Sequence, residues 1–277
     1  MINSNDPIVS VVMPTYNRKK TIGRAIESAL AQTYKNIEII VVDDGSTDGT
    51  KEVVAAYLKN PAVRYIYEEN KGCVVARNEG IERARGKYIA ILDDDDFWCD
   101  KDKIKKQVDF LEKNRDYILV GGGAIKIDSR GKEVAKYLLP EKDEDIRKKI
   151  LTYNAIAHVT ILFKKDAWQK IGGYDKYFDG LEDWELINRI GAIGKIYNIQ
   201  EIFAVYSSHN KENPSYLNKK RSRFKRLGLS IEIIKKYKKY YPGYKKAIIY
   251  CYISYIYSFL PFNQKLWPII FKIRNTF

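Results

Sequence analysis

Four consecutive aspartates at positions 93–96 carry the clearest chemical signal in this sequence. They follow an apolar run, residues 88–92, whose composition predicts a buried β-strand. Adjacent carboxylates repel one another, which costs stability unless a cation neutralises them. Mg²⁺ and Mn²⁺ suit such oxygen ligands, and they can keep coordination positions open for phosphate oxygens. The run indicates either a divalent metal site or a solvated acidic loop, and its place after a strand favours the metal site.

A second acidic pair, Asp43 and Asp44, ends another predicted strand at residues 37–42. The residues that follow match the first positions of an EF-hand loop, but its twelfth position is Ala55 instead of a bidentate glutamate, which excludes that site. A carboxylate at the end of a parallel strand can accept a hydrogen bond from a nucleotide base or a ribose hydroxyl. We expect this role of Asp43 and Asp44, whereas Asp48 is expected to cap the following helix.

A third acidic pair, Glu182 and Asp183, stands where a helix is predicted to begin, over residues 183–193. Acidic residues in this place can serve only to stabilise the helix dipole. Alternatively, one carboxylate acts as a general base toward an acceptor hydroxyl. The residues alone leave both interpretations open.

The elements that must position these residues alternate between strand and helix in the first half of the chain. Strands are expected at residues 8–13, 37–42, 63–67 and 88–92, and helices at 21–32, 48–58 and 74–84. Strands joined by helices of this length form a parallel sheet with right-handed crossovers, and such sheets bind ligands at the carboxyl ends of their strands. The acidic residues at 43–44 and 93–96 lie at those ends.

The second half of the chain has a more mixed pattern. We expect a hairpin from residues 119–127 and 132–138, a helix at 143–151, a strand at 160–164, and edge strands at 195–199 and 202–206. The fold class is therefore α/β, with a mostly parallel central sheet flanked by helices. A basic and aromatic helical extension follows.

Five ordered motifs resemble those of glycosyltransferase family 2, whose members are inverting enzymes with a GT-A (Rossmann-like) fold. The motifs are SVVMPTYN at residues 10–17, VDDGSTD at 42–48, ARNEG at 76–80, LDDDDFW at 92–98 and the Glu182-Asp183 pair. The resemblance covers residues 8–210. It implies a GT-A domain at residues 1–215, divided into a nucleotide-binding half at 1–105 and an acceptor half at 106–215.

The resemblance also implies roles for individual residues. The nucleotide-sugar would be bound by Pro14, Thr15, Tyr16, Asn17, Asp43, Asp44, Arg77, Asp93 and Asp94. Asp183, with Glu182 beside it, would supply the catalytic base. The metal, Mn²⁺ or Mg²⁺, would be bound by Asp95, Asp93 and His209. Asp94 stands where many relatives carry a small residue, so which aspartate meets the metal stays open. His209 has a second interpretation as a surface histidine, and His158 is expected to be structural.

The implied reaction moves a hexosyl or N-acetylhexosaminyl group from a nucleotide-sugar, a UDP-sugar in many relatives, to an acceptor hydroxyl. Negative charge builds on the departing nucleoside diphosphate, and a divalent cation stabilises that charge. One direct displacement inverts the anomeric carbon without a covalent sugar–enzyme intermediate. The chain has only two histidines, which fits a mechanism without a Ser-His-Asp triad.

The net positive charge of this chain comes entirely from its C-terminal quarter. The formal net charge is +14, and residues 211–277 alone carry 16 Lys and Arg against 2 Asp and Glu. Aromatic residues lie among the lysines of 218–246, and residues 247–264 carry no charge. We expect residues 216–277 to be helical and to lie on an anionic membrane surface, on the cytoplasmic, inner face of the cell membrane. A lipid-linked or cell-surface glycan acceptor would fit. The alternative is a helical subdomain packed on the main domain.

Two other classes of protein share some of these features. A sugar-1-phosphate nucleotidyltransferase would need a glycine-rich loop with a basic residue after the first strand, where this chain has residues 14–17, PTYN. A non-enzymatic nucleic-acid-binding protein could use the basic, aromatic segment, but the neutral main body with acidic strand ends argues against it. The three scattered cysteines predict neither a disulfide framework nor a zinc site, and a reducing compartment fits them best.

Overall fold

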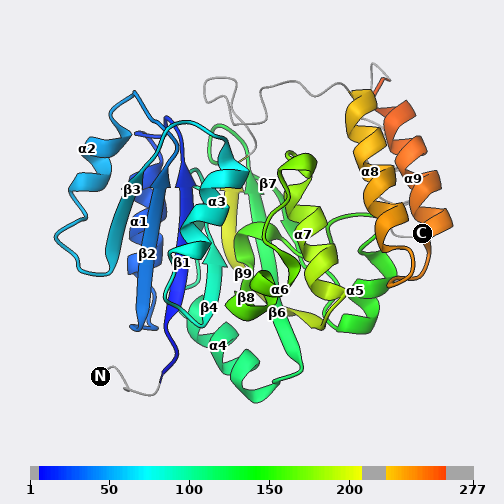
Figure 1. Cartoon of the computed structure of the whole chain (residues 1–277), viewed down its shortest axis with the longest axis horizontal. Helices are drawn as coiled ribbons and strands as arrows, with labels where there is room; N and C mark the ends of the chain where they lie inside the picture. Colours follow the sequence, from blue (N-terminus) through cyan, green and yellow to red (C-terminus); the bar gives the residue numbers. More distant parts are fainter. Residues whose placement is uncertain (1–5, 208–222, 260–277) are drawn as a thin grey trace.

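A nine-stranded sheet with helices on both faces forms the centre of this protein, and a pair of C-terminal helices stands at one side (Figure 1). The computed structural model describes residues 6–207 and 223–259. The first half contains β1 (Val9–Thr15), α1 (Ile22–Leu30), β2 (Ile37–Asp43), α2 (Thr50–Ala55), β3 (Val63–Tyr67), α3 (Cys73–Glu82), β4 (Tyr88–Ile91), β5 (Phe97–Trp98) and α4 (Lys103–Lys113). The second half contains β6 (Tyr117–Ile127), β7 (Glu133–Tyr137), α5 (Asp143–Lys149), β8 (Leu162–Lys164), α6 (Lys165–Ile171), α7 (Glu182–Gly191), β9 (Lys195–Ser207), α8 (Arg223–Tyr237) and α9 (Tyr244–Tyr257).

The first four strands form the parallel part of the sheet that the sequence predicts. Their order is β3-β2-β1-β4, and every pair among them is parallel. Every residue of β1 and β4 is buried, because helices cover both faces, and this explains why these strands read as continuous apolar runs. Helix α3 lies so close to β1 that a Cβ at Gly80 would come within 2.6 Å of Val12 Cγ1. This close packing accounts for the glycine of the ARNEG motif.

The rest of the sheet continues as β8-β6-β9-β5, with β7 paired to β6. The predicted hairpin is confirmed, since β6 and β7 are antiparallel. The prediction of two edge strands at 195–199 and 202–206 is wrong. They form one strand, β9, which lies between β6 and β5. The polar pair Gln200-Glu201 suggested a turn, but a shift in the β6–β9 register accommodates it without ending the strand.

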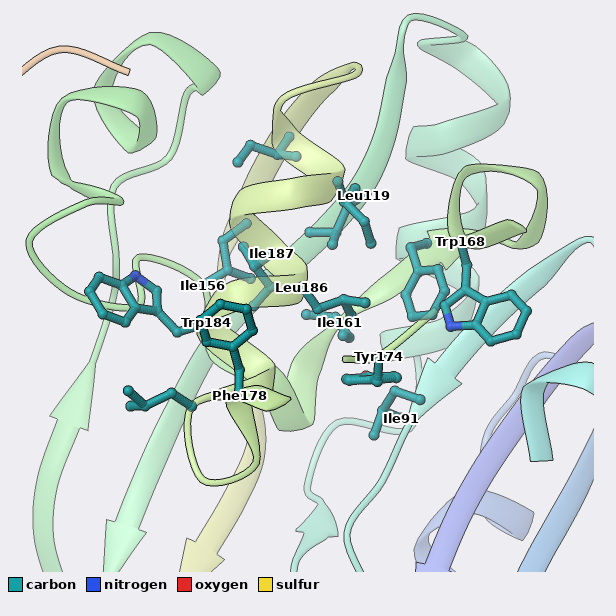
Figure 2. Packing of buried hydrophobic residues seen from close by; sticks show 14 of the residues in the cluster. Ile91, Leu119, Ile156, Ile161, Trp168, Tyr174, Phe178, Trp184, Leu186 and Ile187 are labelled. Carbon is teal, nitrogen blue, oxygen red and sulfur yellow. The ribbon is translucent and has the colours of Figure 1, made fainter. Parts of the chain in front are cut away.

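Two hydrophobic clusters hold the helices on opposite faces of the sheet. One cluster contains α1 and α4, and the other contains α3, α5, α6, α7 and the C-terminal helices. Figure 2 shows part of the second cluster, where Trp184 and Ile187 of α7 lie close to Phe178 and Ile156. Trp184 also donates from Nε1 to the carbonyl oxygen of Ile150 at 2.6 Å. This packing fixes the beginning of α7.

The C-terminal helices pack on α7 through polar as well as apolar contacts. Glu185 is fully buried, and its Oε1 accepts hydrogen bonds from the Tyr237 hydroxyl at 2.6 Å and from Lys236 Nζ at 2.9 Å. The Tyr241 hydroxyl donates to the carbonyl oxygen of Asn188 at 2.6 Å. The extension thus packs on the main domain, as the second interpretation of its sequence expected.

Contact of the extension with a membrane stays a prediction. Within residues 6–207 and 223–259, no helix combines the length and apolar character needed to cross a membrane. The predicted domain boundary at 215/216 lies outside the described residues, and so does His209.

Candidate functional site

One pocket collects the acidic residues that the sequence placed far apart. Its volume is about 630 Å³. It lies where β1 and β4 end, and the start of α7 forms another part of its wall. The predicted site residues that line it are Pro14, Arg77, Asp93, Asp94, Asp95, Glu182 and Asp183, and Asp96 lines it as well. The aspartate run at 93–96 and the Glu182-Asp183 pair, nearly ninety positions apart in the chain, therefore face the same space.

Arg77 joins these two acidic motifs. Its NH2 lies 2.7 Å from Asp93 Oδ1, and its NH1 lies 2.7 Å from Glu182 Oε1. Arg77 is buried on α3, and 30% of the Asp93 side chain and 13% of the Glu182 side chain are exposed, so salt screens this bridge less than a surface ion pair. Burial acts to raise the pKa of Asp93, but the charge and hydrogen bond of Arg77, with smaller contributions from the charges of His158 and Arg18, together outweigh it, and the pKa lies below its ordinary value. Arg77 thus keeps Asp93 ionised and fixes the distance between the two motifs.

The other aspartates of the run are less fully neutralised. Asp94 accepts hydrogen bonds from the Tyr16 amide at 3.3 Å and from Arg18 Nε at 3.2 Å. Burial and the neighbouring charge of Asp95 nevertheless raise the pKa of Asp94 to about 7. Asp96 accepts from the Ser207 amide, and burial with Asp95 again raises its pKa. This edge of the sheet therefore holds more negative charge than its arginines offset.

Asp93 and Asp95 fit a divalent cation that takes its remaining ligands from a substrate. One oxygen of Asp93 faces Arg77, and Asp95 Oδ2 lies 3.7 Å from Arg18 NH2, with 26% of the Asp95 side chain exposed. Within the described part of the chain, no three His, Cys, Asp or Glu side chains are grouped to hold a metal ion. One or two carboxylates completed by phosphate and water form the kind of site that Mg²⁺ commonly occupies. The third predicted ligand, His209, lies outside the described residues.

Asp43 and Asp44 organise the loops beside the pocket. Asp44 accepts hydrogen bonds from the amides of Lys71 and Gly72 at 2.7 and 2.9 Å. Asp43 accepts from the Tyr65 hydroxyl at 2.7 Å and from the amide of Ser46 at 2.8 Å. Both residues are buried, and neither lines the pocket. Their predicted contact with a nucleotide base stays a prediction, because protein groups satisfy both carboxylates here.

The turn after β1 is held to the loop after β2. The amide of Asn17 donates to Ser46 Oγ, and Asn17 Oδ1 accepts from the amide of Thr47, both at 2.8 Å. Thr15 is fully buried and Tyr16 is half-buried, and among residues 14–17 only Pro14 lines the pocket. Asp48 satisfies a free amide at the start of α2, since its Oδ1 accepts from the amide of Thr50 at 3.0 Å, but the N-cap position itself is occupied by Gly49.

Asp183 is oriented by two donors at the start of α7. Its Oδ2 accepts from Asn154 Nδ2 at 3.1 Å, and its Oδ1 accepts from the amide of Trp184 at 2.7 Å.

Sequence reasoning missed Asn154 and Arg18. Arg18 directly follows the PTYN motif, which was a usable signal, whereas Asn154 stands alone in an apolar stretch. His158, expected to be structural, is buried in the pocket wall with Nε2 2.8 Å from the Tyr174 hydroxyl.

Comparison with known proteins identifies the family of this chain. The family model for glycosyl transferase family 2 matches residues 10–171. The chain is 35% identical over 208 residues to an uncharacterised glycosyltransferase of Rickettsia prowazekii, which covers 72% of this chain and 64% of the relative. The chain thus spans less than two thirds of that relative's length.

Two solved structures share the fold. S. aureus TarS 1-349 in complex with UDP-GlcNAc superposes with a TM-score of 0.72 at 17% identity, over 96% of this chain and 79% of TarS 1-349. The mannosyltransferase PcManGT of Pyrobaculum calidifontis, in complex with GDP-Man and Mn²⁺, gives a TM-score of 0.65 at 20% identity, over 98% and 74% of the two chains. The expected GT-A architecture is confirmed. Since the family model covers more than half of the chain, this protein belongs to glycosyl transferase family 2.

Proposed function

We propose that this protein is a metal-dependent, inverting glycosyltransferase that moves a hexosyl or N-acetylhexosaminyl group from a UDP-sugar to an acceptor hydroxyl. One observation carries the proposal: a single pocket contains both the aspartates suited to a diphosphate-bound cation and the carboxylate suited to accept a proton. Family membership supports the reaction class. The UDP-GlcNAc bound to TarS, a protein with the same fold, supports the donor class.

The donor diphosphate is assigned to the strand-end side of the pocket. Asp93 and Asp95 would hold Mn²⁺ or Mg²⁺, and PcManGT, which shares the fold, was crystallised with Mn²⁺. When bound, the ion stabilises negative charge on the departing diphosphate. Arg77 holds Asp93 in place and keeps it ionised, so that the protein need not reorganise when the donor arrives.

The acceptor hydroxyl is assigned to the side of Asp183. In the proposed step, the acceptor oxygen attacks the anomeric carbon and Asp183 takes its proton. The bond from that carbon to the diphosphate oxygen breaks, and its electron pair leaves with the nucleoside diphosphate. The hydrogen bonds from Asn154 and from the Trp184 amide hold the Asp183 carboxylate in one orientation. Holding the reacting groups in the correct orientation contributes much of the rate enhancement of a two-substrate reaction.

We further propose a lipid-linked or cell-surface glycan acceptor, reached from the inner face of the cell membrane. The support is the apolar surface of α9, where Ile249, Tyr252 and Ile256 are 50%, 49% and 63% exposed at helical spacing. Lys245 and Lys246 lie at the start of the same helix. Ile249→Ser with Ile256→Ser should release the protein from anionic vesicles in a sedimentation assay, and unchanged sedimentation would exclude this surface.

A nucleic-acid-binding function loses part of its support, although Phe224, Tyr240 and Tyr244 stay exposed. Tyr237 and Tyr241, which could have stacked on bases, are buried against α7. The glycosyltransferase proposal is tested with a panel of UDP-, GDP- and dTDP-sugars plus Mn²⁺ or Mg²⁺, by measuring the nucleoside diphosphate released. Metal-dependent release from a UDP-sugar, lost with EDTA and in Asp95→Ala, is expected. Release that is insensitive to both would contradict the proposed metal site.

A further inference from the structure

The same pocket has two cationic side chains that the proposed reaction does not use. Lys126 on β6 and Arg226 on α8 both line it. Among the residues that the structure describes, neither cation has a carboxylate within ion-pair distance, whereas Arg77 and Arg18 are bound to the aspartates. Exposed charges contribute little to the free energy of folding, so stability alone does not explain why two cations without an ion-pair partner among the described residues line this pocket. Their placement is therefore suited to an anionic group on a ligand.

An aromatic pair lies next to Lys126. Tyr137 and Tyr206 are stacked, with ring centroids 6.3 Å apart and ring planes at 28°. In the sheet, Tyr206 pairs with Lys126, and Tyr137 pairs with Ala124. Alternate residues of a strand face the same side, so Lys126 and both tyrosines lie on the pocket face of the sheet. Both tyrosines are partly exposed there.

This arrangement matches the chemistry of a charged sugar. A tyrosine ring offers an apolar face and a polar hydroxyl, and a pyranose ring offers C–H groups to the first and hydroxyls to the second. Arg226 stands on α8, the helix that packs against the Asp183-bearing helix α7 through Tyr237. The cation is thus carried by the same structural unit that supports the proposed base, and not by the strand ends assigned to the donor.

We propose that β6, β7, β9 and α8 form an acceptor subsite for a sugar that carries a negative charge, either a carboxylate or a phosphate. The sugar ring lies against Tyr137 and Tyr206, and its anionic group lies between Lys126 and Arg226. This inference rests on the proposed function, because it specifies the acceptor class of that site.

The test separates acceptor binding from donor turnover. Binding of methyl β-glucuronide, glucose 6-phosphate and neutral methyl β-glucoside to the full chain is measured by saturation-transfer NMR in the presence of UDP and diamagnetic Mg²⁺. Donor hydrolysis by water is measured in parallel. The variants are Lys126→Gln and Arg226→Gln. Matched controls are Lys136→Gln, which is exposed on β7, and Lys235→Gln, which is exposed farther along α8.

We expect one charged sugar to bind about tenfold more tightly than the glucoside, as a charge-assisted hydrogen bond would give. The preference should disappear in Lys126→Gln and Arg226→Gln, remain in both controls, and leave the KM for donor hydrolysis unchanged. Whichever charged sugar binds identifies the anion as carboxylate or phosphate.

Three results would overturn the subsite. These are equal binding of charged and neutral sugars, a preference that survives in both variants, and a raised donor KM in Lys126→Gln, which would assign the cation to the donor. If inorganic phosphate competed with the charged sugar and bound equally tightly, the site would recognise the anion alone and not a sugar. Absence of nucleotide-sugar hydrolysis in the parent protein would instead count against the proposed function, whatever the binding result.

Discussion

The two sides of the pocket hold their charges in different ways. On the strand-end side, Arg77 is paired with Asp93 and Arg18 is paired with Asp94. Both arginines and Asp94 are buried. On the side of β6 and α8, Lys126 is half-buried, Arg226 is exposed, and neither is ion-paired within the described residues. Charges that ion pairs hold in one orientation are preorganised for one ligand, whereas exposed, unconstrained side chains adapt at low cost. We therefore expect the donor side to tolerate few changes and the acceptor side to tune specificity.

The largest effect is expected where the two sides meet, at Asp183. Asp183→Asn keeps the shape of the side chain but cannot take the acceptor proton. The rate of transfer should fall by about 10³-fold, within the range for losing a general base, while UDP binding measured by calorimetry stays the same. Asp166→Asn is the control, because that carboxylate is exposed on α6 and forms only a long surface ion pair. Near-normal transfer by Asp183→Asn would assign the base to another residue.

Arg77→Met should produce the next largest effect, because it removes the bridge between the sides. Asp93 and Glu182 would lose their common cation, and Glu182 is left with little access to water. Breaking a buried ion pair from one partner costs about 3 kcal/mol or more. Urea denaturation should show this loss in the free energy of unfolding. Adding Glu182→Gln to Arg77→Met should restore part of it, and strictly additive losses would mean that the two residues are not coupled.

Tyr237→Phe tests the support of the acceptor side. It removes the hydroxyl that donates to the buried carboxylate of Glu185. A hydrogen bond to a charged group contributes about 1.5–3 kcal/mol, so the unfolding free energy should fall by about 2 kcal/mol. Tyr240→Phe is the control, because Tyr240 lies in the turn after α8 and is exposed, and it should change the unfolding free energy little. Equal effects of the two variants would show that α8 is not held to α7 by this contact.

Lys103 extends the comparison to a fully buried lysine that has no ion pair within the described residues. It lies 2.7 Å from Gln107 Oε1 and 4.1 Å from the centre of the Trp98 ring. Burial lowers its pKa well below the ordinary value, against the smaller opposing effect of Asp100. The unfolded chain then binds the proton more readily, so stability should rise with pH between the lowered pKa and the ordinary one, by at most about 1.4 kcal/mol per pH unit.

Lys103→Met should remove this pH dependence. The variant should gain most over the parent at the low-pH end of that window, and the gain should shrink as the pH approaches the pKa of an unfolded lysine. Thermal unfolding across the pH range measures both quantities, with Lys105→Met, on the exposed face of α4, as the control. A constant difference between variant and parent would mean that Lys103 does not titrate on unfolding.

The parallel half of the fold could be predicted from sequence because its signals are local. Burial on both faces makes β1, β2 and β4 continuous apolar runs, and α1 has a clear buried stripe at Ile22, Ala25, Ile26 and Ala29. The sequence did not reveal α4 and α6, because lysines surround their few apolar positions. The continuity of β9 was also hidden, since a bulge that absorbs Gln200 and Glu201 depends on its partner strand β6.

The site was predictable to the extent that sheet geometry determines it. The acidic residues at 93–96 share a pocket with Glu182 and Asp183, as the resemblance to the family implied. The sequence could not predict which residues bind and orient the carboxylates of the site. The arginine bridge from Arg77, the donation from Asn154 to Asp183 and the bonds that occupy Asp44 all join residues distant in the chain. The cation at 226 enters the pocket only because α8 packs on α7.

The proposed reaction requires the strand-end side of this pocket to bind a nucleoside diphosphate through a divalent cation. A crystal structure of the full chain with UDP and Mn²⁺ tests it most directly. We expect anomalous density for Mn²⁺ between the diphosphate and Asp93 or Asp95, with Asp183 left free to face an acceptor. UDP bound elsewhere, such as in the basic pocket of about 590 Å³ formed by Arg85, Arg115 and Lys164, or bound here without the ion, would contradict it.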